Sequence, residues 1–243
     1  MTTVPKRAMV LAAGRGERLR PYTDRMPKPL VEVGGKPLID HALDRLASIG
    51  VEIAVVNVSY RRADLENHLK GRCLPKIIIS PESERLETGG GVANALESLG
   101  DDPFYVVNSD VLWSGGRSDS LFRLAEFWDS ASMDALLLVQ PTVRAVGYHG
   151  RGDFQLGPLG EVRRREERET APFVFAGVQI LAPGLFMDCP KMPFSLNLIY
   201  DRAMRLGRLF GFVNEGRWTH IGTPEGLARA RALYPAPSHA PQS

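Results

Sequence analysis

The chain has 243 residues, 44% of them hydrophobic, which is enough for one large buried core. Thirty Lys and Arg residues against 28 Asp and Glu residues give a formal net charge of +2, so the basic excess typical of nucleic-acid-binding proteins is absent. The two cysteines, Cys73 and Cys189, lack the spacing of a zinc site. No apolar segment approaches the roughly 20 residues needed to cross a bilayer. We therefore expect a soluble, cytoplasmic protein without a nucleic-acid or membrane partner.

Short apolar runs alternate with segments of helical periodicity along the chain. The runs expected to form buried strands are residues 8–13, 53–58, 76–80, 104–107 and 135–139. The segments expected to form helices between them are residues 38–49, 64–69, 92–99 and 120–128. The pattern then loosens into short strands with turns over 147–182, a helix over 196–206, a strand over 209–213 and a helix over 224–233 with Thr223 as its N-cap.

This alternation predicts a three-layer, Rossmann-like α/β fold, in which helices cover both faces of a mainly parallel mixed sheet. Ligands of such sheets bind at the carboxyl ends of the strands. A glycine turn follows the first strand, and Asn108-Ser109-Asp110 follows the fourth, so the two segments are expected to share one crevice. We expect a single domain over residues 1–234 and a disordered tail over 235–243.

The segment after the first strand is rich in glycine and cations. Residues 9–30 read MVLAAGRGERLRPYTDRMPKPL, with Arg15, Arg18, Arg20, Arg25 and Lys28. Glycine lets backbone N–H groups approach phosphate oxygens closely, and Arg and Lys bind phosphate through hydrogen bonds and charge. The segment therefore predicts a site for a small anion, although a solvated surface position is the simpler interpretation of Arg15, Arg20 and Arg25.

Two better-known phosphate motifs do not fit. The dinucleotide fingerprint GxGxxG begins at Gly14 and Gly16, but Leu19 occupies the position of its third glycine. The GGKP segment at 34–37 has Pro37 where a P-loop requires Ser or Thr.

The same segment resembles the opening signature of the nucleoside-triphosphate sugar-1-phosphate nucleotidyltransferase family, LAAG-x-G-x-R-L-x-P followed by PKPL. Glu17 stands where many members carry Thr. Further segments similar to the family are LETGGG at 86–91, NSDV at 108–111, HGRGDF at 149–154, FAGVQIL at 175–181 and WTHIGTPEGL at 218–227. The resemblance implies a GT-A-like nucleotidyltransferase fold and two small-molecule substrates, a nucleoside triphosphate and a sugar 1-phosphate.

Within this family, the combination of ETGGG, HGRGDF and W-x-x-x-GT is most similar to the N-acetylmuramate 1-phosphate uridylyltransferases of cell-wall recycling. The implied reaction is attack of the sugar phosphate on the α-phosphorus of UTP, with release of pyrophosphate. Mannose-1-phosphate guanylyltransferases and glucose-1-phosphate uridylyl- or thymidylyltransferases share the opening signature and stay open as alternatives. A catalytically inactive nucleotide-sugar-binding module is an alternative of another class. The oligomeric state is not predicted.

The resemblance also implies roles for individual residues. Arg18 would contact the phosphate that is transferred or leaves, Lys28 the charge around the α-phosphate, and Asp110 the metal. The residues implied in nucleotide binding are Leu11, Ala12, Ala13, Gly14, Gly16, Glu17, Arg18, Lys28, Glu87, Gly89 and Gly90. Those implied in sugar-phosphate binding are Asn108, Gly152, Asp153 and Gly177.

The expected cofactor is Mg²⁺ on Asp110, since this ion binds through one or two carboxylates plus substrate phosphates. Family members supply a second aspartate from the motif W-x-D-x-G-T, where this chain has His220. Imidazole suits Mn²⁺, Zn²⁺ or Co²⁺ better than Mg²⁺. Three arrangements are open: Asp110 alone holds Mg²⁺, His220 joins a softer metal, or His220 contacts a phosphate. We favour the first as a hypothesis.

A second departure concerns the cation that binds the sugar phosphate. Many relatives use the lysine of an E-K-P segment, whereas residues 161–169 here read EVRRREERE. Balanced runs of charge are typical of a solvated face. The alternative is that one arginine of this run, or Arg151, supplies the missing cation.

Overall fold

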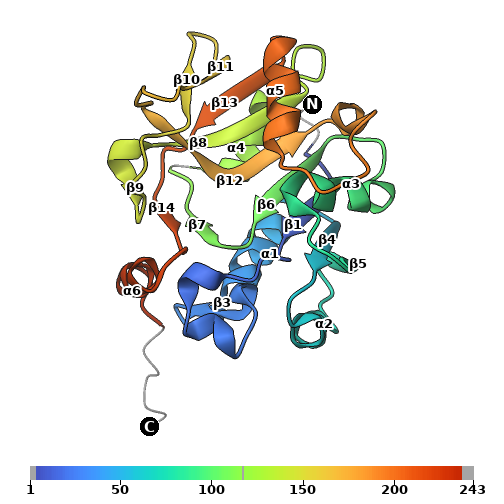
Figure 1. The fold of residues 1–243 in the computed structure, drawn as a ribbon, viewed down its shortest axis with the longest axis vertical. Coiled ribbons are helices and arrows are strands. Elements are labelled where there is room, and N and C mark those ends of the chain that lie inside the picture. The colour runs from blue at the N-terminus through green and yellow to red at the C-terminus, as the bar shows by residue number, and fades with distance from the viewer. Residues whose placement is uncertain (1–3, 117, 237–243) are drawn as a thin grey trace.

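The computed structural model describes residues 4–116 and 118–236, and within them nine strands form the central sheet (Figure 1). The sheet order is β11-β10-β12-β6-β1-β4-β5, with β8 pairing β12 and β13 off this path. Their bounds are β1 Arg7–Leu11, β4 Ile53–Val58, β5 Lys76–Pro81, β6 Phe104–Asn108, β8 Ala135–Pro141, β10 Phe154–Leu156, β11 Val162–Arg164, β12 Phe173–Leu181 and β13 Leu209–Val213.

The direction of the strands matches the predicted fold class. Strands β5, β4, β1 and β6 run parallel, and so do β8 and β13. Strand β12 runs antiparallel to both β6 and β8 and joins the two parallel groups. The predicted Rossmann-like fold with a mainly parallel mixed sheet is confirmed.

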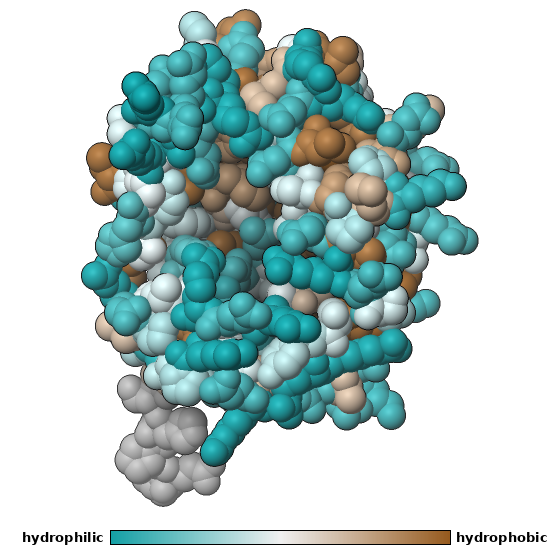
Figure 2. Space-filling model, in the orientation of Figure 1, coloured by the Kyte–Doolittle hydropathy of each residue, from teal (hydrophilic) through white to brown (hydrophobic). Residues whose placement is uncertain are grey.

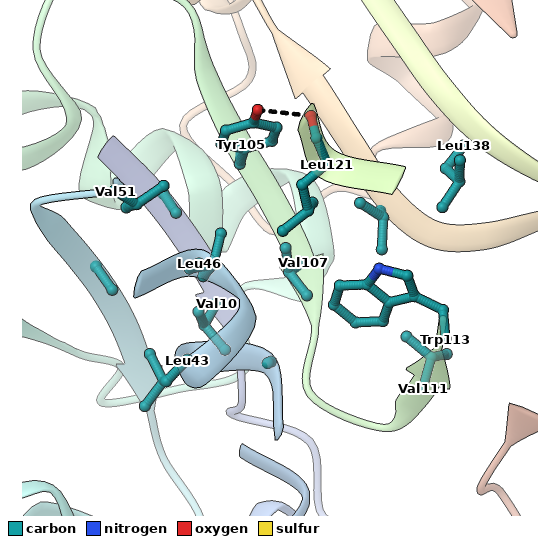
Figure 3. Packing of buried hydrophobic residues seen from close by; sticks show 14 of the residues in the cluster. Val10, Leu43, Leu46, Val51, Tyr105, Val107, Val111, Trp113, Leu121 and Leu138 are labelled. Atoms are coloured by element: carbon teal, nitrogen blue, oxygen red, sulfur yellow. Dashed lines mark hydrogen bonds between the residues drawn. The ribbon is translucent and has the colours of Figure 1, made fainter. Parts of the chain in front are cut away.

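Helices lie on both faces of the sheet. Their bounds are α1 Leu38–Ser48, α2 Arg62–Leu69, α3 Glu87–Leu99, α4 Ser120–Phe127, α5 Asn197–Arg205 and α6 Pro224–Leu233. Successive strand residues point to opposite faces, so Val10 packs with Leu43 of α1 whereas Met9 packs with Val92 of α3. Figure 3 shows the first of these cores, where Tyr105 of β6 also donates a hydrogen bond of 2.8 Å to the Leu121 carbonyl of α4. The three predicted layers are therefore present.

Helix α3 begins at Glu87, five residues before the predicted start at Val92. Three consecutive glycines argue against a helix on propensity alone. Here they are buried, and their missing side chains leave room for Phe194 beside Gly89 and for Glu82 and Asn57 beside Gly91. Tertiary packing therefore extends the helix into a segment that its composition disfavours.

Short strands form two smaller sheets besides the central one. Strands β7 (Val111–Trp113), β14 (Trp218–His220) and β9 (Ala145–Val146) form a second sheet, and β2 (Glu32–Val33) pairs with β3 (Lys36–Pro37). Within the GGKP segment, Gly34 and Gly35 form the turn of the β2–β3 hairpin, at φ values of 64° and 75°, and Lys36 and Pro37 form β3. Helix α6, whose N-cap Thr223 accepts a hydrogen bond from the Gly226 amide as predicted, packs Leu227 against Leu19. The segment after β1 is thereby held against the C-terminal helix.

The surface of the face seen in Figure 2 is mostly hydrophilic, with apolar side chains gathered in patches. No helix in the described ranges is long and apolar enough to span a membrane. The predicted tail over 235–243 lies outside the described residues from position 237 onward.

Candidate active site

The glycine loop and the Asn108-Ser109-Asp110 turn meet at the carboxyl ends of neighbouring strands. Leu11 at the end of β1 pairs in register with Asn108 at the end of β6. The Ser109 hydroxyl and amide both donate to the Leu11 carbonyl, at 2.8 and 3.2 Å. The two segments therefore border one crevice, at the position expected for a ligand of this fold.

An ion pair between Lys28 and Asp110 lies at this junction. Lys28 Nζ donates to Asp110 Oδ2 at 2.6 Å, and the lysine side chain is 11% exposed. Burial alone would raise the pKa of the Asp110 carboxyl, but the Lys28 ammonium and the His220 ring outweigh it and hold that pKa well below its usual range. Asp110 is therefore an anion at neutral pH, available to a cation.

His220 faces the same carboxylate from a third element. Its Nε2 lies 3.7 Å from Asp110 Oδ2, because β14 pairs with β7 and sets His220 opposite Val111. The imidazole stacks on the Trp218 ring at 6.2 Å, and the Trp218 indole donates to the Ala176 carbonyl at 2.8 Å. A side chain at Gly222 would come within 2.5 Å of His220 Cε1. The sheet, the indole and this glycine together keep the imidazole beside Asp110.

The glycine loop is partly fixed and partly open. Gly16 adopts a left-handed φ of 66°, and its carbonyl accepts from the Leu19 amide at 2.8 Å and the Thr23 hydroxyl at 2.9 Å. A Cβ at Gly16 would lie 2.9 Å from Lys28 Cβ, whereas a Cβ at Gly14 would meet nothing within 4 Å. The loop thus packs against Lys28 at Gly16 and leaves the surroundings of Gly14 free.

The cations of the opening segment divide into two groups. Lys28 is paired with Asp110, and Arg20 with Asp24 at 3.3 Å. Arg15, Arg18 and Arg25 make no hydrogen bond or ion pair within the described residues. Arg18 is exposed beside the glycine loop, which leaves its guanidinium free to meet an anion.

The start of α3 is bonded to a distant segment. The amides of Gly89 and Gly90 both donate to the Phe194 carbonyl, at 2.9 and 3.1 Å, and Thr88 Oγ1 accepts from the Leu196 amide at 3.0 Å. The two glycine amides implied in nucleotide binding therefore have a protein partner in this arrangement, and a nucleotide would reach them only after Phe194 had moved. Glu87 has a left-handed φ of 60°, which is uncommon outside glycine and typical of functional segments.

The four residues implied in sugar-phosphate binding fall into two pairs. A Cβ at Gly177 would lie 3.2 Å from Asn108 Cβ, so this pair borders the Asp110 turn. Asp153 instead accepts a hydrogen bond from the Phe175 amide at 2.9 Å, and the Gly152 carbonyl accepts from Arg165 Nε at 2.8 Å. Gly152 and Asp153 therefore make contacts within the protein that hold the start of β10 against β12 and the loop at Arg165.

Three of the four arginines in the run over 161–169 bind other groups of the protein. Arg163 pairs with Glu169 at 3.1 Å, and Arg164 pairs with Asp201 at 3.0 Å. Arg165 donates to backbone carbonyls of its own loop. Within the ranges that the structure describes, the side chains of Arg151 and of Arg168, both exposed, make no hydrogen bond or ion pair, so these two arginines stay available for a ligand.

Two polar residues near the site were not identified from the sequence. Asn57 and Glu82 stand at the ends of β4 and β5, are 3% and 8% exposed, and hydrogen-bond to each other at 2.7 Å. The signal for Asn57 is a polar residue inside an otherwise apolar run, Ile53–Val58. A buried polar side chain at a strand end of this fold is a candidate for a role at the ligand site.

This geometry agrees with the comparisons to known proteins. A family model described as nucleotidyl transferase matches residues 7–167, which is more than half of the chain. The chain belongs to this family. The glycine loop, Lys28 and Asp110 lie inside the matched range, whereas the similar segments at 175–181 and 218–227 lie beyond it.

Curated members of the nucleotidyl transferase family resemble nearly the whole chain. The N-acetylmuramate alpha-1-phosphate uridylyltransferase of Caulobacter vibrioides is 44% identical over 96% of this chain and 98% of its own length. The protein of the same name from Neisseria meningitidis serogroup B is 36% identical over 93% and 97%. A solved structure of UDP-glucose pyrophosphorylase complexed with UDP-glucose has a TM-score of 0.77 at 20% identity, covering 94% of this chain and 98% of that one, and supports the fold.

Replacement of Gly89 by Ala tests the contact between α3 and Phe194. The new Cβ would overlap the Phe194 ring and lie 2.9 Å from its carbonyl oxygen. We expect a decrease of about 1–3 kcal/mol in the free energy of unfolding, despite the higher helix propensity of Ala. Urea denaturation measures it. Gly184→Ala, where nothing lies within 4 Å of the new Cβ, is the matched control, and equal effects of the two changes would contradict the contact.

Proposed function

We propose that this protein transfers the uridylyl group of UTP to N-acetylmuramate 1-phosphate, forming the nucleoside-diphosphate sugar and pyrophosphate. The observation that carries the proposal is the Lys28–Asp110 pair beside the glycine loop, since a lysine that can bind phosphate and a carboxylate that can bind a metal ion lie side by side there. The choice of base and sugar is supported by the two relatives of that name, which match the chain over nearly its full length.

The chain's own residues bring two polyanions together. An oxygen of the sugar 1-phosphate attacks the α-phosphorus of UTP, and pyrophosphate leaves with the electrons of the broken P–O bond. Catalysis of this step is mainly positioning and neutralisation of charge. Lys28 binds the α-phosphate oxygens, Arg18 binds the phosphates that leave, and backbone amides of the glycine loop orient the triphosphate.

The residues present fit a divalent cation that is shared with the substrate. Within the described ranges there is no cluster of three or more Asp, Glu, His and Cys residues that could hold an ion alone. Asp110 is an anion with a partly exposed side chain, and Mg²⁺ is commonly held by one carboxylate, water and substrate phosphates. The bound ion would neutralise the phosphates and keep them in line. Asp110 would hold it, with His220 beside it.

The sugar is assigned to the side of the crevice formed by Asn108 and Gly177. Gly177 has a φ of 77°, and its lack of a side chain leaves room next to Asn108. N-acetylmuramate carries a lactyl carboxylate in addition to its phosphate, and Arg151 is the cation proposed to bind it. Gly152 and Asp153 support this loop through the contacts described above.

The first prediction concerns the substrates and the metal. Purified protein is offered UTP with N-acetylmuramate 1-phosphate, GTP with mannose 1-phosphate, and UTP or dTTP with glucose 1-phosphate, each in Mg²⁺ and in Mn²⁺. We expect pyrophosphate release to be fastest with the first pair in Mg²⁺. A faster rate with another pair would make the chain a guanylyl- or thymidylyltransferase of the same family. No turnover with any pair would favour the inactive binding module.

The second prediction concerns Lys28. Lys28→Gln keeps a hydrogen-bond donor but removes the charge that stabilises the phosphates, so kcat should decrease by roughly 10²–10³-fold. Lys36→Gln is the matched control, because Lys36 also donates to an aspartate at 2.6 Å, but on the exposed β2–β3 hairpin. Steady-state kinetics measures both variants. Similar rates for the two would remove Lys28 from the proposed mechanism.

The third prediction concerns His220. His220→Asp supplies a second hard ligand next to Asp110, so Mg²⁺ should bind more tightly and the rate in Mg²⁺ should hold or increase. Titration calorimetry with Mg²⁺ and UTP measures the affinity independently of turnover. A collapse of the rate in Mg²⁺ would show that the imidazole has a specific role of its own.

A further inference from the structure

A buried hydrogen-bonded pair links the glycine loop to the segment that leads into α3. Asn57 at the end of β4 is 3% exposed, and its Oδ1 accepts from the Ala12 amide at 2.7 Å. Its Nδ2 donates to Glu82 Oε1 at 2.7 Å. The two functional groups of one amide side chain thus contact two loops that are far apart in the sequence.

Glu82 continues the link. The residue is 8% exposed, its carboxylate makes no ion pair within the described part of the chain, and Oε2 accepts from the Leu86 amide at 3.4 Å. A buried carboxylate without a cation depends on hydrogen-bond donors. Asn57 supplies the shorter of its two bonds, so the orientation of the Glu82 carboxylate depends on Asn57, while the backbone at residue 82 is also held by the Val58 carbonyl at 2.9 Å.

Gly91 provides the space for this pair. A Cβ at position 91 would lie 2.8 Å from Glu82 Oε1 and 2.9 Å from Asn57 Nδ2. The first turns of α3 therefore pack directly on the hydrogen bond, and the start of the helix is fixed relative to β4 and β5.

We propose that Asn57 is a positioning residue of the nucleotide site, which holds the phosphate-facing loop after β1 and the segment before α3 at one fixed separation. The inference rests on the proposed function, in which the glycine loop binds the triphosphate, and on the nucleotide contacts that the resemblance implies for Glu87, Gly89 and Gly90, directly after the second segment. A nucleoside triphosphate spans both, and binding to a preformed site avoids the entropy cost of ordering two loops separately.

The chemistry at position 57 requires an amide. The Ala12 amide needs an acceptor, and the Glu82 carboxylate needs a donor. Aspartate would accept from Ala12 but would place a second carboxylate against Glu82. Alanine would leave both partners without their bond.

The first experiment needs no nucleotide. Hydrogen exchange is measured on peptides that cover residues 11–16 and 82–91 in the wild type and in Asn57→Ala. We expect exchange to increase in both segments together, by about tenfold or more, because one side chain holds both. An increase in neither segment, or in one alone, would overturn the proposal.

Asn214→Ala is the matched control. Asn214 is 1% exposed, accepts from the Ser120 hydroxyl and donates to Gln140 Oε1, both at 2.8 Å, and contacts neither loop. Its replacement should lower the stability of the protein without a selective effect on residues 11–16 and 82–91. An equal effect of both variants on these peptides would identify Asn57 as a merely structural residue.

The second experiment measures nucleotide affinity and rescue. The dissociation constant of UTP should increase at least about tenfold in Asn57→Ala and in Asn57→Asp. The double variant Asn57→Asp with Glu82→Gln reverses the bond, because the amide introduced at position 82 can donate to the carboxylate introduced at position 57, and it should recover affinity relative to Asn57→Asp. Affinity in Asn57→Ala equal to the wild type, or no recovery in the double variant, would overturn the proposal.

The outcomes separate this inference from the proposed function. If the wild type prefers GTP or dTTP, the proposed substrate is wrong, and the same variants are compared with the preferred nucleotide. If the wild type turns over UTP but Asn57→Ala leaves exchange and affinity unchanged, the proposed function stands and the positioning role of Asn57 is wrong.

Discussion

The ion pair between Lys28 and Asp110 joins residues 82 positions apart, and the site is organised around it. It can form only because β1 and β6 are neighbours and end at the same level, so that the loops after them meet. Each partner compensates the charge of the other in a partly buried place, where an isolated charge would be costly. The pair therefore stabilises the arrangement that a phosphate and a divalent cation would later use, with the lysine available to the anion and the carboxylate to the cation.

The small second sheet and helix α6 also hold the segments that carry the Lys28–Asp110 pair. Strand β7 begins directly after Asp110, and β14 pairs with it. This pairing brings His220 Nε2 to 3.7 Å from the Asp110 carboxylate. Helix α6 follows and packs on Leu19 and Val33, so the C-terminal part of the domain covers the segment that carries the opening cations. That segment contains three short 3₁₀ turns, at Glu17–Leu19, Tyr22–Asp24 and Lys28–Leu30, which have little core of their own, so its position depends on this packing.

The sequence predicted most of the fold, because apolar runs and helical periodicity record burial directly, as in Ile53–Val58 and Leu38–Ser48. It also predicted that the glycine loop and Asp110 lie together, since parallel strands end at one edge. It did not predict the start of α3 at Glu87 or the Asn57–Glu82 pair, because both depend on contacts between distant segments that no local pattern encodes. Composition could not show which arginines of the 161–169 run contact the protein itself, whereas the structure gives Arg163, Arg164 and Arg165 protein partners.

The contacts at α3 bear on where the positive charge of the site comes from. In many phosphate sites, the free amides of a helix N-terminus supply it. Here the amides of Gly89 and Gly90 are already bonded to the Phe194 carbonyl, so this helix end offers fewer donors to a ligand. In the proposed function, side chains and the metal ion would then neutralise the substrates, and Lys28 and Arg18 flank the loop in which Gly14 has open surroundings. The dense cations of the opening segment and the capped start of α3 are in this sense complementary features of one site.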